Sequence, residues 1–192
     1  MAQPANILNQ NISIKRLQEM RNFGGEILTH GLKEEILKKF ISHDQNLRSA
    51  IESAYEHFVV LQKEKPDFLL LSEKEQIKLA QQNIVNFYAN ENVNPYVAIS
   101  AMGPWIVTLK GAVIYDCGGY GMLGLGHSPK LALNEIKKPH VMANVMTPSL
   151  SQMEFIGILK KEIGHSRTNK STFTEFCCLN SGSESVSIGA RL

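Results

Sequence analysis

The sequence lacks the features that mark exported, membrane-spanning or disulfide-stabilised proteins. No apolar run approaches the roughly 20 residues that cross a bilayer. The N-terminus has no basic cluster followed by an apolar core, so we expect no secretory signal. The three cysteines, Cys117, Cys177 and Cys178, are odd in number, and two are adjacent within an apolar run. This pattern favours reduced thiols in the core, and a cytoplasmic protein, over a disulfide framework.

An excess of charge of either sign is also missing. Twenty Lys and Arg residues stand against 18 Asp and Glu residues, which gives a net charge of +2 over 192 residues. So small a charge does not favour nucleic acid or an anionic membrane as the main partner. Hydrophobic residues make up 43% and charged residues 20%, close to the averages for globular proteins, so we expect a folded core.

The first half of the chain has the periodicity of helices. Across residues 32–63, apolar residues recur mostly at steps of three, four or seven, with an expected break near 43–44. Residues 72–75 read as a capping box that opens another helix, extending through Ile84 to Tyr88. We therefore expect a helical N-terminal extension over residues 1–95.

Strand signals begin after this extension. Residues 105–109 and 112–116 are β-branched and aromatic runs on either side of Lys110-Gly111. Glycine at position 111 can take the positive φ that a tight turn requires, so the pattern predicts a β-hairpin. With the glycine-rich stretch that follows, this hairpin forms the expected segment 96–148.

Helix and strand signals then alternate to the end of the chain. Ser128 as N-cap and proline at the next position predict a helix over 129–138. A second helix is expected over 149–163, with Ser151 and Glu154 in capping-box register. Residues 173–179 read as a buried strand, and a further helix should begin at Ser183. This succession predicts an α/β layer with a parallel sheet, starting in segment 149–192.

One glycine-rich segment, 119–124, fits the spacing G-x-G-x-x-G and raises the alternative of a dinucleotide-binding fold. Two features argue against it. The next helix signal waits until Ser128, and no Asp or Glu lies about 20 residues beyond Gly124 to bind ribose. A plain flexible turn is the simpler interpretation.

The segment 180–184, Asn-Ser-Gly-Ser-Glu, is a better candidate anion site. It leads from the predicted strand directly into a helix N-terminus, where free N–H groups and the helix dipole favour a phosphate. Ser181 and Glu184 also fit a plain capping box, which occurs in proteins that bind nothing. Spacing alone leaves both interpretations open.

Three linked motifs resemble the class III aminotransferases, a family of pyridoxal-phosphate enzymes. Residues 111–116 followed by 119–130 are similar to that family's G-x-x-L-x-D hairpin and the loop ending G-H-x-H-P. About fifty residues later, 180–185 resembles the family's N-S-G-[ST]-E-A, and 190–192 matches the helix that follows. Two positions depart from the pattern, because the second loop histidine is missing and Ser185 replaces alanine.

The resemblance implies an α/β protein that is the N-terminal part of a fold-type I pyridoxal-phosphate transferase, with segment 149–192 starting its large, cofactor-binding domain. It assigns the phosphate of pyridoxal 5'-phosphate to Ser181, Gly182 and Ser183. It places the Schiff-base lysine and the aspartate that pairs with the pyridine nitrogen beyond position 192, so no catalytic residue is assigned. Tyr120 is the candidate substrate contact, with a packing role as its alternative.

The implied reaction passes an amino group from an amino acid or amine to a 2-oxo acid, in an enzyme that is a homodimer at full length. We expect no metal, because Cys177 and Cys178 have no partner ligands at zinc-like spacing. His127 reads as a loop-stabilising donor rather than a catalytic base. The alternative from another class is a non-catalytic interaction module, in which the helical extension binds a partner and the α/β part is a relic scaffold.

Overall fold

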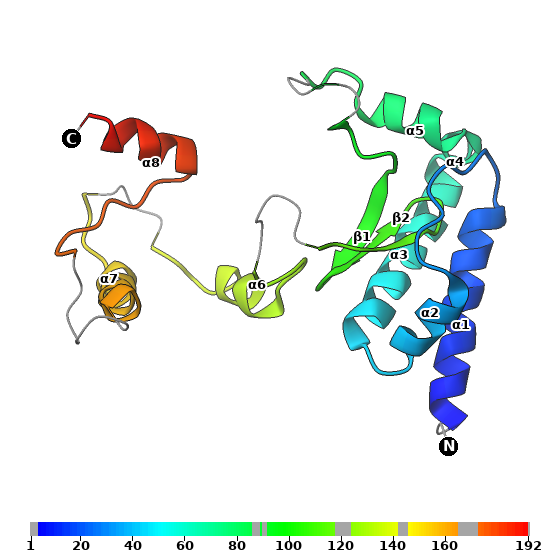
Figure 1. The fold of residues 1–192 in the computed structure, drawn as a ribbon, viewed down its shortest axis with the longest axis horizontal. Helices are drawn as coiled ribbons and strands as arrows, with labels where there is room; N and C mark the ends of the chain where they lie inside the picture. Colours follow the sequence, from blue (N-terminus) through cyan, green and yellow to red (C-terminus); the bar gives the residue numbers. More distant parts are fainter. Residues whose placement is uncertain are drawn as a thin grey trace. The chain divides into compact units, whose positions relative to one another are not determined.

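The computed structural model describes residues 4–85, 89, 92–117, 124–141, 146–164 and 173–191. The chain forms two compact units, Met1–Lys137 and Lys138–Leu192, called here the N-terminal and C-terminal units. The described residues contain eight helices and one three-stranded antiparallel sheet (Figure 1). The expected mixture of helices and strands is confirmed at this level.

Five helices open the N-terminal unit: α1 Pro4–Asn22, α2 Glu34–Ile41, α3 Gln45–Glu64, α4 Pro66–Leu70 and α5 Glu73–Ala80. The predicted break near 43–44 is confirmed, because Asp44 caps α3 by accepting from the N–H groups of Asn46 and Leu47. The capping box of α5 is also confirmed. Its predicted extension through Ile84 is wrong: α5 ends at Ala80, and Asn83 then adopts a φ of +66°, which a helix cannot contain.

The sheet consists of β1 Ala98–Met102, β2 Trp105–Thr108 and β3 Val113–Tyr115, in that order. The predicted hairpin is confirmed by the antiparallel pairing of β2 with β3, and Gly111 in its turn has a φ of +70°. Strand β1 was not predicted. Its residues AISAM carry only one β-branched side chain, and an irregularity interrupts its pairing with β2, so the local signal is weak.

Helices and sheet in the N-terminal unit share one core. Helix α3 packs against β1 and β2 and also against α1 (Figure 1). The apolar side chains that this packing buries most completely include Met20, Leu37, Ile41, Leu47, Ile51, Phe58, Trp105, Val107 and Val113. The helical residues before position 95 are therefore built into the same body as the hairpin.

The tip of the hairpin carries a lysine that lies inside this body. Lys110 is 2% exposed, and its ammonium donates to three backbone carbonyls, those of Gly24 at 2.5 Å, Leu69 at 2.9 Å and Leu71 at 2.7 Å. Burial lowers the pKa of this amine, and the nearby Glu73 carboxylate acts in the opposite direction. Lys110 thus ties the hairpin to the segment after α1 and to the C-terminal end of α4.

Beyond the sheet, the predicted helices are confirmed as α6 Lys130–Ile136 in the N-terminal unit and α7 Leu150–Gly164 and α8 Gly182–Gly189 in the C-terminal unit. The α7 cap differs in detail from the prediction. Ser149, rather than Ser151, accepts from a backbone N–H at the start of this helix, that of Gln152 at 3.2 Å.

The predicted buried strand over 173–179 is wrong. These residues form neither helix nor strand, and Phe173 is 59% exposed. A strand needs a neighbour with which to exchange backbone hydrogen bonds, and the only sheet of the described residues is antiparallel and lies in the other unit. The expectation of a parallel sheet is therefore not met there.

The expectation of buried thiols is wrong as well, because all three cysteines are exposed. Throughout the described part of the C-terminal unit, no residue reaches full burial.

Across the residues whose structure is described, no helix combines the length and the apolar character needed to span a bilayer.

Candidate cofactor-binding site

The segment before α8 folds as a complete capping box. The Ser181 hydroxyl accepts from the Glu184 N–H at 3.2 Å, and the Glu184 carboxylate accepts from the N–H groups of Asn180 at 3.0 Å and Ser181 at 3.2 Å. Ser181 has an extended backbone, with φ −143° and ψ 156°, as an N-cap residue requires. The hydroxyl of Ser185 donates back to the Ser181 carbonyl at 3.1 Å. Local hydrogen bonds therefore fix the start of α8.

The capping box leaves part of this helix start unused. Its contacts do not involve the N–H groups of Gly182 and Ser183 or the Ser183 hydroxyl. These groups occupy the first turn of α8, where the helix dipole favours an anion. Because the segment is exposed, a ligand could approach them from solvent. The two interpretations of the sequence are thus compatible: the turn is capped, and it still has three donors for an oxyanion.

Among the described residues, nothing gives Gly182 a steric role. A Cβ atom built at this position would meet no atom within 4 Å, and the backbone does not have the positive φ that favours glycine. The fold therefore accepts alanine at position 182. If glycine is needed there, the reason must be the close approach of another molecule.

The three residues predicted to bind the cofactor phosphate, Ser181, Gly182 and Ser183, lie together at this helix start. The predicted substrate contact, Tyr120, falls outside the described residues, as does most of the glycine-rich segment 119–124. The loop around His127, which the resemblance also includes, lies in the N-terminal unit.

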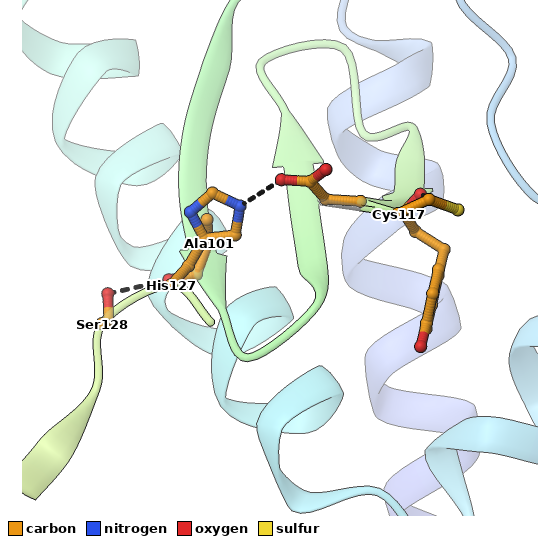
Figure 2. A network of polar contacts seen from close by, with 6 residues as sticks. Ala101, Cys117, His127 and Ser128 are labelled. Carbon is orange, nitrogen blue, oxygen red and sulfur yellow. Dashed lines mark hydrogen bonds and ion pairs between the residues drawn. The ribbon is translucent and has the colours of Figure 1, made fainter. Parts of the chain in front are cut away.

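The His127 ring is hydrogen-bonded to the Asp116 carboxylate, with 2.9 Å between Nε2 and Oδ2 (Figure 2). Both side chains are partly buried. Sequence reasoning singled out His127 as a loop-stabilising donor, and this contact is consistent with that role. Figure 2 also shows the Cys117 thiol pointing away from the His127 ring, so the thiol is not part of the pair.

Backbone contacts hold the same two residues to the turn between β1 and β2. His127 exchanges both backbone hydrogen bonds with Gly103, at 2.8 and 2.9 Å, and the Asp116 N–H donates to the Pro104 carbonyl at 2.7 Å. The preceding Gly126 has a φ of +74°, and a Cβ atom there would lie 2.8 Å from the Cα of Gly103. Glycine at position 126 is required by this close approach.

The predicted N-cap at Ser128 is wrong. Ser128 has a φ of +50°, and its hydroxyl donates to the Ala101 carbonyl at 2.8 Å instead of capping α6 (Figure 2). Pro129 occupies the N-cap position without a side-chain hydrogen bond to the helix. The hydroxyl is used to hold the loop onto β1.

Asp116 also acts on Tyr96. Burial raises the pKa of the Tyr96 phenol, and the negative charge of Asp116 adds to that rise. Sequence reasoning missed the burial of Tyr96 and the effect of Asp116 on it, because both depend on how residues 96–104 fold back against the hairpin.

The searched part of the chain contains no group of three or more His, Cys, Asp or Glu side chains that could hold a metal ion.

Comparison of the chain with known protein families, with curated proteins and with solved structures finds no match. The residues and their geometry are therefore the basis for assigning a function. Two features bear on that function: the three free donors at the start of α8, and the His127–Asp116 loop in the N-terminal unit.

Proposed function

We propose that the first turn of α8 binds the phosphate of pyridoxal 5'-phosphate, and that this chain is the N-terminal part of a class III aminotransferase. The observation that carries the proposal is the set of donors left free by the capping box, the N–H groups of Gly182 and Ser183 and the Ser183 hydroxyl. The resemblance of segments 111–130 and 180–185 to that family supports the choice of cofactor.

Each residue of the turn has a separate task in this proposal. Ser181 and Glu184 hold the turn in shape through the capping box. Gly182 lets the phosphate come close to the backbone, and Ser183 donates from its N–H and its hydroxyl. Charge-assisted hydrogen bonds of this kind contribute about 1.5 to 3 kcal/mol each. The Glu184 carboxylate opposes them, because it is a like charge close to the phosphate.

The cofactor supplies an electron sink for the transfer of an amino group from an amino acid or amine to a 2-oxo acid. The resemblance assigns the Schiff-base lysine and the pyridine-pairing aspartate to sequence outside these 192 residues. Lys110 is not a substitute, since its ammonium already donates to three carbonyls. In this proposal the chain binds the cofactor phosphate. The groups that transfer protons lie outside these 192 residues, in a cytoplasmic homodimeric enzyme.

Exposed apolar side chains support the idea of a larger assembly. Helix α7 leaves Leu150, Met153, Phe155 and Ile158 exposed, and Val186 of α8 is 73% exposed. A helix with apolar residues around its circumference is typical of a position between two covering layers. The described part of the C-terminal unit provides no such layers. In the proposed aminotransferase, other parts of the enzyme would supply them.

Titration of the 192-residue chain with inorganic phosphate, followed by two-dimensional NMR, tests the phosphate site. We expect the amide signals of Gly182 and Ser183 to move first, with a Kd of about 1 mM, which corresponds to about −4 kcal/mol. Gly182→Asp should abolish the shifts, because a carboxylate at this position repels the anion and fills its approach.

Two matched variants separate a phosphate cradle from a plain helix cap. Gly182→Ala leaves the fold intact but should weaken phosphate binding about tenfold, or about 1.4 kcal/mol, because its methyl group occupies the path of the ligand. Glu184→Gln keeps an acceptor for the capping box while removing the charge, so it should tighten binding. If phosphate and pyridoxal phosphate leave the signals of residues 182–183 unmoved at tens of millimolar, the proposal is wrong and the interaction-module alternative gains support.

A further inference from the structure

Two exposed thiols stand side by side shortly before the candidate phosphate turn. Cys177 and Cys178 are both free and both exposed. They lie in segment 173–179, which is neither helix nor strand, so changing the backbone there breaks no strand ladder. Nothing in the proposed aminotransferase chemistry uses these two thiols.

The spacing of adjacent cysteines disfavours a direct disulfide. Consecutive Cα atoms are about 3.8 Å apart, whereas disulfide-bonded residues usually have Cα atoms about 4.4 to 6.8 Å apart. A single atom inserted between the two sulfurs relaxes this conflict. With bonds of about 2.3 Å to a tetrahedral centre, for example, the sulfurs would be about 3.8 Å apart instead of about 2.0 Å.

The number of nearby ligands decides which atom fits between the sulfurs. A structural zinc ion takes four protein ligands, and within the searched residues no third His, Cys, Asp or Glu joins the two thiols. A monosubstituted trivalent arsenic centre has only two positions to exchange. Two neighbouring thiols satisfy such a centre completely, without help from any other residue.

We propose that Cys177 and Cys178 form a two-thiol site that is modified by trivalent arsenicals. In the reaction with an organoarsenic oxide, two As–S bonds form and the arsenic–oxygen bond is lost. The oxygen leaves as water with the two thiol protons, and no oxidation or reduction takes place. Cys117 is exposed as well but has no neighbouring cysteine, so it can form only one such bond.

Phenylarsine oxide is the probe for this site. After incubation of the reduced, folded chain with a slight excess, intact-mass spectrometry should show one phenylarsenic group per chain. Titration with a thiol reagent should show that the three reactive cysteines of the chain have decreased to one. A dithiol such as 2,3-dimercaptopropanol should reverse the reaction, whereas a monothiol at the same thiol concentration should not.

Three serine variants complete the test. Cys177→Ser and Cys178→Ser should each weaken arsenical binding about 100-fold, since the second bond benefits from the high effective concentration of an adjacent thiol. Cys117→Ser, the matched control, should bind as the unmodified chain does. The inference is overturned if Cys117→Ser abolishes binding, if either other variant retains it, or if Cys177 and Cys178 of the untreated chain prove to be joined in a disulfide.

Discussion

Lys110→Met is expected to lower the free energy of unfolding of the N-terminal unit by about 3 kcal/mol. The substitution keeps most of the aliphatic stem and removes the ammonium that donates to the carbonyls of Gly24, Leu69 and Leu71. Leu69 keeps a partner, because its carbonyl also accepts from the Gln76 side chain at 3.3 Å. The other two carbonyls lose the partner that Lys110 provides.

The size of this loss follows from two opposing effects. A buried carbonyl left without a donor costs about 1 to 3 kcal/mol, and two carbonyls are affected. The Glu73 carboxylate, which is 1% exposed, also loses a nearby positive charge. Against this, methionine avoids the desolvation cost that lowers the pKa of the Lys110 amine. Three buried groups lose a favourable partner, namely the carbonyls of Gly24 and Leu71 and the carboxylate of Glu73, whereas the desolvation of only one ammonium is avoided. We therefore expect a net loss of stability.

Urea unfolding followed by the fluorescence of Trp105 measures this change. Trp105 is the single tryptophan of the chain and is buried in the N-terminal unit, so its signal reports on that unit. Lys15→Met is the matched control, because the Lys15 side chain is 77% exposed and pairs only at the surface with Glu19. The control should change the free energy by less than about 0.5 kcal/mol. Equal stabilities of the two variants would contradict the structural role of Lys110.

Trp105→Ala is expected to have the largest effect of any single truncation, about 4 kcal/mol. The indole is 1% exposed and packs edge-on against Phe40 and Tyr115, with ring centroids 5.1 and 5.0 Å away. Its Nε1 donates to Asp44 at 2.7 Å, which connects β2 to the N-cap of α3. Alanine would leave a cavity between the sheet and the helices.

Trp105→Phe separates packing from hydrogen bonding. Phenylalanine keeps much of the aromatic packing but loses the N–H donor, while the other carboxylate oxygen of Asp44 still caps α3. We expect a loss of about 1 to 2 kcal/mol for this variant. Because both variants remove the fluorophore, native-state hydrogen exchange of the α3 amides should be used to compare them. Similar losses for both variants would show that the hydrogen bond, rather than the packing, dominates.

The features that sequence reasoning predicted correctly are local ones. The break before α3 near Asp44 and the capping box at Ser72 depend on residues within one turn of each other, and the hairpin turn depends on Gly111. The candidate phosphate turn at 181–184 is local in the same sense, so its capping geometry could be anticipated.

The features that were missed depend on distant partners. A Lys-Gly pair in a hairpin usually reads as an exposed turn, yet Lys110 is buried because carbonyls more than 35 residues away in the sequence converge on it. The contact of His127 with Asp116 depends on the loop crossing the turn at Gly103. Segment 173–179 has strand-forming residues, but the described residues of its unit include no strand with which it could pair, so composition alone misled the prediction.

The anchoring of Asp116 and His127 to the same turn has a consequence for how this protein can vary. Both ends of the intervening stretch are held by Gly103 and Pro104, so the entrance and exit of that stretch are fixed by the sheet. A substitution that disturbs the turn at Gly103 and Pro104 should therefore release Asp116 and His127 together, which makes this turn of the sheet a single point of control over both residues.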